Sequence, residues 1–267
     1  MRRPRRDKGV RLTARDTQIF EDLLERRADS LGSIHARHWP TAAQDTARRR
    51  LGVLVNDGFL NRIYLERPPA ALVHSGDDES GWVHAYTLTP RGIAALRRRS
   101  LAGSVLRGRS VKGDLDEAAI PHQLAVNRVG ELLGTPLRPD HLLDLPGDRR
   151  HRPDATYQAR PDTTGRRTVM LEIDLGHYSR QRILGKLSTF LADPDATGVL
   201  FACPTDERAA WIAKTLRAAH GDRIMDRVQV LTFTQIQEGR LLRDALRPAP
   251  DAELSPSDVY DHLPRAA

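Results

Sequence analysis

The sequence predicts an α+β protein of two domains, an N-terminal helix-turn-helix with a two-stranded wing and a C-terminal α/β domain with a mixed sheet. Before residue 57 the apolar residues recur with helical spacing, and two strand-like segments, 59–66 and 82–88, follow them. After residue 117, helical and strand-like segments alternate along the chain. This change of pattern predicts a separate core for each part.

The composition between these parts predicts the domain bounds. Residues 98–116 are polar, with Gly and Ser at intervals, and are expected to form a linker. The expected domains are therefore 10–97 and 117–247. A basic tail over residues 1–9 precedes them, and a loose C-terminal tail over residues 248–267, rich in Pro, Asp and Ala, follows them.

Positive charge is concentrated in the N-terminal part of the chain. The whole sequence carries a net charge of +7, from 42 Lys and Arg against 35 Asp and Glu. Residues 1–110 hold 21 basic against 12 acidic residues, and the remaining residues hold 21 against 23. This distribution is typical of a nucleic-acid-binding module joined to a roughly neutral second domain. Double-stranded DNA is therefore the expected partner, and a basic face that is merely solvated is the alternative.

Composition also excludes several classes of protein. No apolar run approaches the roughly 18 residues of a membrane span, and the basic N-terminus lacks the apolar stretch of a signal peptide. The single cysteine, Cys203, cannot form an intrachain disulfide or a zinc site of several cysteines. We expect a cytoplasmic protein without a membrane partner. Whether it forms a homodimer is left open.

The N-terminal segments follow the order of a winged helix-turn-helix. A first helix is expected to begin at Thr13, an N-cap with Asp16 three residues on, and to end at about Arg26. A third helix is expected to begin at Thr41, with Gln44 at the capping-box position. The third helix is expected to end at residue 56. A second helix is expected over residues 30–38, and a fourth over residues 89–98. In this order the third helix is the recognition helix.

Several residues of the third helix are candidates for DNA contact. Ala47, Leu51 and Leu54 share the core face, so Asp45 and Arg49 point away from it. Arg and Gln side chains make bidentate hydrogen bonds to guanine and adenine, whereas Arg50 and Arg62 are expected to contact phosphates. The full candidate set is Thr41, Gln44, Asp45, Arg48, Arg49, Arg50 and Arg62. A winged helix used only for protein contacts is the alternative.

The second domain is expected to contain helices and strands in alternation. Its predicted helices cover residues 117–133, 179–192, 205–219 and 234–246, and its apolar or strand-like segments lie around 142–145, 152–157, 168–174, 198–202 and 227–233. This order predicts an α/β sandwich with a mixed sheet.

Three carboxylates gather on two of these strands. Asp154 follows Pro153, and Glu172 and Asp174 alternate in one strand and so share a face. Neighbouring carboxylates repel unless a cation or a strong donor lies between them, and their oxygens suit Mg²⁺ or Mn²⁺. Asp154 and Glu172 are therefore candidate metal ligands, and all three are candidate catalytic residues. In the alternative, Asp154 caps a turn and the other two pair with arginines such as Arg180 or Arg182.

Pro-Asp followed by Glu-x-Lys on the next strand is the pattern of the PD-(D/E)xK nuclease superfamily, which this segment resembles. The resemblance implies a restriction-endonuclease-like fold. Asp174 stands at the position of the lysine, so the following helix is expected to supply the missing side chain, with Lys186 and Gln181 as candidates. His122 lies on the apolar face of the helix expected over residues 117–133, which precedes these strands. It is either a core residue or a residue that faces the carboxylates across the sheet.

Several short segments together resemble the replication-relaxation family of plasmids and integrative elements, over about residues 10–245. They are His122-Gln-Leu-Ala-Val-Asn127, Arg152-Pro-Asp-Ala155, Leu171-Glu-Ile-Asp-Leu-Gly176, Lys186-Leu187 and the aromatic Phe190, where the family usually has Tyr. The resemblance implies a winged helix joined to a nuclease-like fold. It also implies a role in the replication, relaxation or transfer of element DNA, with a relaxase or a replication protein as partner.

Three functions follow as expectations. The first is a DNA-binding accessory protein of a mobile element. The second is an endonuclease that uses Asp154 and Glu172 with Mg²⁺ or Mn²⁺. The third is a winged-helix transcriptional regulator whose second domain senses a ligand or mediates dimerisation.

Overall fold

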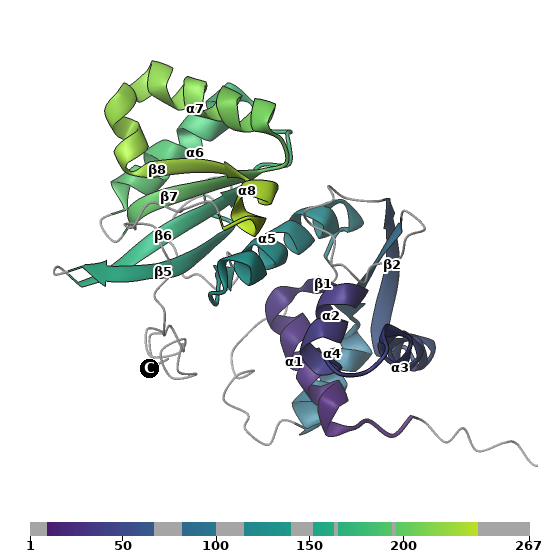
Figure 1. Cartoon of the computed structure of the whole chain (residues 1–267). Coiled ribbons are helices and arrows are strands. Elements are labelled where there is room, and N and C mark those ends of the chain that lie inside the picture. Colours follow the sequence, from purple (N-terminus) through teal and green to yellow (C-terminus); the bar gives the residue numbers. More distant parts are fainter. Residues whose placement is uncertain are drawn as a thin grey trace, which may run out of the picture. The chain divides into compact units, whose positions relative to one another are not determined.

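A computed structural model describes residues 10–66, 82–99, 115–139, 152–162, 165–193 and 196–239. The chain is a mixed α+β protein with one three-stranded and one five-stranded sheet. It divides into two compact units, residues 1–124 and 125–267, so the division falls within one helix (Figure 1). The expected linker and C-terminal tail lie largely outside the described residues.

The first unit contains helices and a small antiparallel sheet. Its elements are α1 (Ala14–Arg26), β1 (Ala28–Ser30), α2 (Leu31–His38), α3 (Gln44–Asn56), β2 (Leu60–Glu66), β3 (Trp82–Leu88) and α4 (Pro90–Arg99). The sheet has the order β1-β3-β2, with Tyr64 opposite His84 and Glu66 opposite Trp82. The expected helices and the two expected strand segments, 59–66 and 82–88, are confirmed, whereas the three-residue strand β1 was not predicted.

Capping explains where the helices begin. The Thr13 side chain and Asp16 form the predicted capping box of α1, and Ser30 caps α2. The predicted start of α3 is wrong, because its N-cap is Ala43, which offers no side-chain hydrogen bond. Thr41 instead lies in a turn closed by the Ala42 N–H, which donates to the carbonyl of the buried Trp39 at 3.0 Å.

Two apolar clusters hold the first unit together. The larger joins the inner faces of α1, α2 and α3 through residues such as Phe20, Ile34 and Leu51. The predicted core residues Ala47, Leu51 and Leu54 are all buried in it. The smaller cluster covers the other face of the sheet, where Ile120 and Leu124 pack against Ala85. These two residues begin the next helix, α5 (Ile120–Leu133), which follows a short 3₁₀ turn, η2 (Glu117–Ala119).

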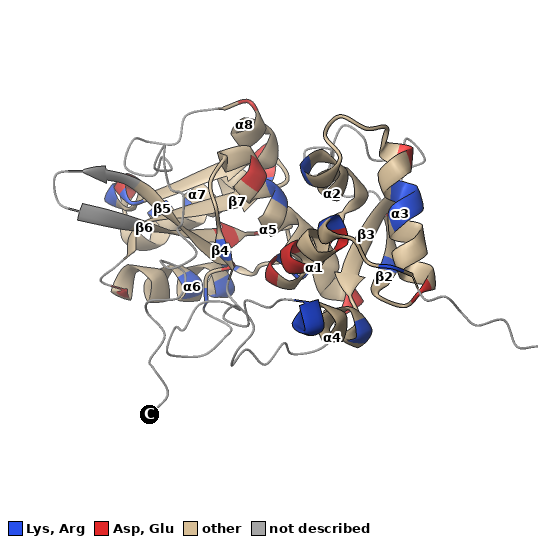
Figure 2. Ribbon diagram, turned by 90° about the horizontal axis from the view of Figure 1, so that it is seen from below, with Lys and Arg blue, Asp and Glu red and all other residues tan. Residues whose placement is uncertain are grey.

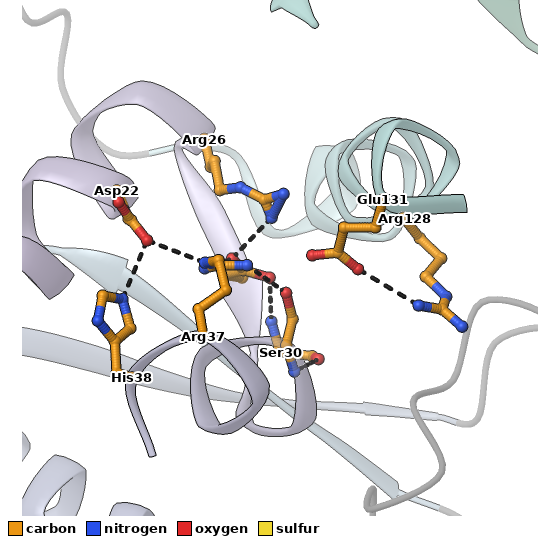
Figure 3. Close-up of polar contacts among 9 residues, drawn as sticks. Asp22, Arg26, Ser30, Arg37, His38, Arg128 and Glu131 are labelled. Atoms are coloured by element: carbon orange, nitrogen blue, oxygen red, sulfur yellow. Dashed lines mark hydrogen bonds and ion pairs between the residues drawn. The ribbon is translucent and has the colours of Figure 1, made fainter. Parts of the chain in front are cut away.

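A polar network ties α1, β1 and α2 together (Figure 3). The guanidinium of Arg37 donates to Asp22 at 2.9 Å and also pairs with the buried Asp29. His38 Nε2 lies 3.0 Å from the same Asp22 carboxylate, and Arg26 lies 3.2 Å from Asp29. Burial raises the pKa of Asp22, but His38 and Arg37 outweigh this effect, so the pKa is lowered overall. The network therefore stabilises the charged carboxylate at neutral pH.

The second unit is built on a mixed sheet. Besides residues 125–133 of α5, its elements are β4 (Arg138–Pro139), β5 (Ala155–Asp162), β6 (Gly165–Ile173), α6 (Arg180–Ala192), β7 (Ala196–Cys203), α7 (Asp206–His220), η5 (Asp222–Asp226), β8 (Val228–Thr232) and α8 (Phe233–Gln237). The strand order is β4-β5-β6-β7-β8, antiparallel from β4 to β6 and parallel from β6 to β8. Helices α6 and α7 make the crossovers that parallel strands need, and they cover one face of the sheet (Figure 1).

The sequence predicted most of these elements. The α6, α7, β7 and β8 segments agree with the expected ranges to within two residues at each end. The expected apolar segment at 142–145 lies outside the described residues. The last helix, predicted over 234–246, is shorter than expected, because α8 ends at Gln237 and a turn with Gly239 at positive φ follows. The two-residue strand β4 was not predicted. Among the described residues, no helix has both the length and the apolar character that crossing a membrane requires.

Candidate functional site

Helix α3 carries cationic residues, which are blue on its ribbon in Figure 2, and the side chains of Arg48 and Arg49 lie on its outward face. Arg49 is the most exposed of these, with 80 % of its side chain accessible, and Arg48 is partly exposed beside it. Asp45, one turn earlier, lies 3.2 Å from Arg48 and 3.9 Å from Arg49, pairs that solvent weakens. The two guanidinium groups therefore remain available to an anionic partner.

Two further candidates lie at the start of α3. Thr41 is exposed in the turn before the helix, and Gln44 is half-buried in its first turn. The Nε2 of Gln44 is buried and has no hydrogen-bond partner among the described residues. A polar atom in this state gains free energy from any partner that reaches it.

Arg50, which was expected to contact a phosphate, is engaged within the first unit. Its guanidinium donates to both carboxylate oxygens of Asp16, at 2.9 and 2.5 Å, and to the Arg11 carbonyl at 3.1 Å. Burial raises the pKa of Asp16, but the hydrogen bonds from Arg50 and Thr13 lower it by a larger amount, so the pKa is lowered overall. Arg50 thus holds α3 against the N-terminus of α1. Fewer of its guanidinium N–H groups remain for a phosphate contact.

Arg62 lies on β2, next to α3. Its guanidinium lies 5.2 Å from the ring centroid of the exposed Tyr64. Burial raises the pKa of Tyr86, and the positive charges of Arg62 and Arg48 oppose that shift. Strand β2 packs next to α3, so Arg62 lies on the strand beside the helix that carries Arg48 and Arg49.

A second candidate site lies on the sheet of the second unit, where Asp154, Glu172 and Lys186 meet. Asp154 immediately precedes β5, Glu172 lies near the end of β6, and Lys186 lies in the middle of α6. The ammonium of Lys186 is 2.5 Å from Oε1 of Glu172 and 3.9 Å from Oδ1 of Asp154. It also donates to the Arg152 carbonyl at 3.0 Å. The structure thus brings together two of the predicted carboxylates and the lysine expected from the following helix.

The backbone fixes this arrangement. The Ile173 N–H donates to Oδ2 of Asp154 at 2.7 Å, and the Asp154 N–H donates to the Leu171 carbonyl at 3.0 Å. Asp154 is therefore tied to β6 beside Glu172. Ile183 and Leu187 seat α6 in the apolar core and so aim Lys186 at the sheet.

Glu172 is fully buried, and its charge is strongly disfavoured. Burial raises the pKa of Glu172 to about 8, and repulsion from Asp154 adds to the effect. Lys186 and the Tyr178 hydroxyl lower it in part. A carboxyl with a pKa near neutrality exchanges its proton readily at physiological pH, which is typical of functional sites. Tyr178, which the sequence analysis did not single out, therefore belongs to this site.

Asp174, the third expected carboxylate, is engaged elsewhere. Its Oδ2 accepts from Nε and Nη2 of Arg208 in α7, at 2.9 and 2.6 Å, and its Oδ1 accepts from the Gly176 N–H at 2.8 Å. Arg208 also donates to the Tyr178 carbonyl. Asp174 therefore orders the turn that carries Tyr178, and its partner is Arg208 in place of the expected Arg180 or Arg182.

The chemistry of Asp154 and Glu172 fits a hard divalent cation. Both supply oxygen ligands, and neither oxygen of Glu172 has a hydrogen bond of regular geometry among the described residues. No group of three or more Asp, Glu, His or Cys residues suited to a metal occurs within the described ranges. A Mg²⁺ or Mn²⁺ ion at this place would therefore complete its coordination with water or with a phosphate.

Two further candidates remain, Gln181 and His122. Gln181 is exposed in the first turn of α6, whereas Lys186 of the same helix is buried at the carboxylates. His122 is half-buried and belongs to the first unit, next to Ile120 and Leu124 of the apolar cluster.

Comparisons with protein-family models, with curated proteins and with solved structures return no match to this chain. The resemblance to the replication-relaxation family therefore stays a prediction from short motifs.

Proposed function

We propose that this protein binds double-stranded DNA through a winged helix-turn-helix in its first unit, with α3 in the major groove. The observation that carries the proposal is the outward face of α3, where Arg49 is exposed and Arg48 is partly exposed, while Leu51 and Leu54 fix the opposite face in the core. Base edges in the major groove are contacted by side chains near the N-terminus of such a helix, and arginine is well suited to this contact.

The arrangement around α3 supports this proposal. The element order, three helices followed by the β2–β3 hairpin, is that of a winged helix. Arg62 adds a cation on the strand beside the helix, and the sequence places the whole excess of positive charge in this part of the chain. In the described residues, this charge is seen on α3 and at the end of α4 (Figure 2).

The biological role that we propose is an accessory function in the replication, relaxation or transfer of a mobile element. It rests on the resemblance to the replication-relaxation family, whose motifs include the Pro153-Asp154 and Glu172-x-Asp174 segments. A relaxase or a replication protein is the proposed protein partner. The second unit would then provide a further contact with DNA or with that partner.

The test is duplex binding measured by fluorescence anisotropy over a range of salt concentrations. Affinity should fall steeply with salt, because binding releases counterions from the phosphates. Replacing both Arg48→Ala and Arg49→Ala should weaken binding at least about tenfold, since each base contact contributes roughly 1–3 kcal/mol. Arg97→Ala with Arg98→Ala, which removes the same charge from α4, is the matched control. Equal affinities for both double variants would refute the assigned surface.

A second candidate function, a metal-dependent DNA endonuclease, is favoured by the cluster of Asp154, Glu172 and Lys186 on a mixed sheet. Asp154 and Glu172 would hold a Mg²⁺ or Mn²⁺ ion, which when bound activates water and stabilises charge at a phosphodiester. Lys186 positions the Glu172 carboxylate, and the Tyr178 hydroxyl also interacts with that carboxylate.

Incubation of supercoiled plasmid with Mg²⁺ or Mn²⁺ tests this second function. Nicking that is lost in Glu172→Ala would support it, provided that Glu207→Gln, an exposed acidic residue at the start of α7, retains the activity. If the wild-type protein binds duplex DNA but nicks no plasmid with either metal, the endonuclease function is refuted and only a binding role remains for the second unit.

A further inference from the structure

The β2–β3 hairpin presents two faces with different chemistry. Ile63 and Leu65 point to the apolar cluster that contains Val83, Ala85 and Ile120, so this face is covered. Side chains alternate along a strand, and the opposite face therefore carries the even-numbered positions. We call this opposite surface the hairpin face, and it consists of Arg62, Tyr64, Glu66, Trp82 and His84.

Large aromatic side chains are exposed on the hairpin face. Tyr64 is 52 % exposed and Trp82 is 49 % exposed. The described residues contain two other exposed large hydrophobic residues, Val53 on α3 and Trp211 on α7. Tyr64 and Trp82 are diagonal neighbours across the strand pair, because Tyr64 lies opposite His84 and Trp82 lies opposite Glu66. Aromatic side chains in such diagonal positions are within reach of each other, and we call these two rings the platform.

The platform is held in place from both sides. The edge of the His84 ring packs against Tyr64, with centroids 4.9 Å apart and an interplanar angle of 78°. The Arg62 guanidinium lies 5.2 Å from the centroid of the same ring. The covered face of the hairpin is fixed by its apolar contacts. The Tyr64 ring is therefore ordered before any partner arrives, which lowers the entropy lost on binding.

Charge determines which partner suits this platform. The Arg62 guanidinium borders the Tyr64 ring, and β2 lies next to α3, which carries Arg48 and Arg49, so the cations lie on the side of the helix. Glu66 places a negative charge at the other end, beside Trp82. A chain of phosphates would meet cations near α3, while its bases would lie toward the rings. Aromatic rings beside arginines are the combination that stacks unpaired bases and holds their backbone.

We propose that the hairpin face binds unpaired nucleotides of a DNA strand that continues from the duplex held by α3. The inference rests on the proposed function for the duplex, but it uses a different set of side chains. Stacking on Tyr64 and Trp82 needs no particular sequence, because every base offers a flat face. The protein would thus prefer a duplex with an unpaired arm over a blunt duplex. A protein ligand on these rings is the competing occupant, and the experiment below separates the two.

The test compares three DNA probes by fluorescence anisotropy, a blunt duplex, the same duplex with an unpaired oligothymidylate arm, and the oligothymidylate alone. The wild-type protein should bind the armed duplex more tightly than the blunt one. Tyr64→Ala and Trp82→Ala should each reduce that preference about tenfold, since stacking on an aromatic contributes roughly 1–3 kcal/mol per base. Affinity for the blunt duplex should stay unchanged. Tyr64→Phe, which retains the ring, should retain the preference.

Asn61→Ala is the matched control, because Asn61 is an exposed residue of β2 outside the hairpin face. A 2-aminopurine in the arm gives an independent readout, since stacking on a ring quenches or shifts its emission. Equal affinity of the wild-type protein for armed and blunt duplexes, or an arm preference that survives both alanine variants, would overturn the inference. Failure of duplex binding with retained, Tyr64-dependent binding of oligothymidylate would refute the proposed function alone.

Discussion

The Nζ of Lys186 in α6 lies 2.5 Å from Oε1 of Glu172 in β6, and both side chains are almost completely buried. This ion pair joins a helix to the sheet inside a site that also contains Asp154. Breaking a buried pair leaves an uncompensated charge, whereas replacing both partners by apolar groups is often neutral. The pair therefore makes a weak net contribution to stability, and we attribute its presence to the chemistry of the site.

At a pH above the raised pKa of about 8, where Glu172 is ionised, Lys186→Met alone should lower the free energy of unfolding by about 3 kcal/mol, because Glu172 and Asp154 lose their cation. The double variant Glu172→Leu with Lys186→Met should recover most of that loss, to within about 1 kcal/mol of the wild type. Urea unfolding followed by circular dichroism measures both values. A double variant that is less stable than Lys186→Met would show that the pair is a main support of the fold.

Stability should depend on pH through Glu172. Its pKa is raised from 4.5 to about 8 in the folded protein, so between these values the folded state holds a proton that the unfolded state releases. The free energy of unfolding therefore falls as pH rises through this interval. Glu172→Gln should flatten the dependence, and the difference between the two urea-unfolding profiles isolates it. Parallel profiles of wild type and variant would contradict the raised pKa.

Arg49 and Arg50 are adjacent in sequence but should separate in function. Arg50→Ala removes the partner of the buried Asp16 and should destabilise the protein by about 2 kcal/mol, as expected for hydrogen bonds to a charged group. Arg49→Ala, on the exposed face, should leave thermal stability unchanged and weaken duplex binding. Thermal unfolding and anisotropy on the same two variants check the prediction. A loss of stability in Arg49→Ala together with a loss of duplex binding alone in Arg50→Ala would contradict the prediction.

Gly52 lies inside α3, and a Cβ at this position would meet no atom of the protein within 4 Å. Gly in a helix interior is less favourable than Ala by about 1 kcal/mol, so Gly52→Ala should raise the free energy of unfolding by that amount. If α3 lies in a groove, the added methyl group should reduce duplex affinity. Opposite changes in stability and affinity are thus expected, and a gain in both would place Gly52 away from the DNA.

Patterns with a strong local cause were predicted well from the sequence. The Thr13 and Asp16 capping box and the apolar stripe of Ala47, Leu51 and Leu54 follow from side-chain chemistry within one helix. The start of α3 was placed too early because burial of Trp39, a tertiary effect, determines the turn that contains Thr41. The strand β1 has three residues, too few for an alternating pattern to appear.

The site was predicted in part. Asp154 and Glu172 were recognisable because a strand pattern places them, but the partners of Asp174 and Lys186 depend on how α6 and α7 pack on the sheet. Arg208 lies 34 residues from Asp174, and no local pattern links the two. Tyr178 was missed for the same reason, since its place beside Glu172 results from the turn that Arg208 and Asp174 hold.

The position of α3 on the duplex can be measured directly by tethered cleavage. The chain has a single cysteine, Cys203, which is buried, so Thr46→Cys on the exposed side of α3 introduces one reactive site for an iron chelate. Bound to duplex DNA, this derivative should cut a few adjacent positions on each strand, and the equivalent derivative of Arg97→Cys on α4 should not. Cleavage that is absent from the α3 derivative, or equally strong from the α4 derivative, would contradict insertion of α3 into the groove.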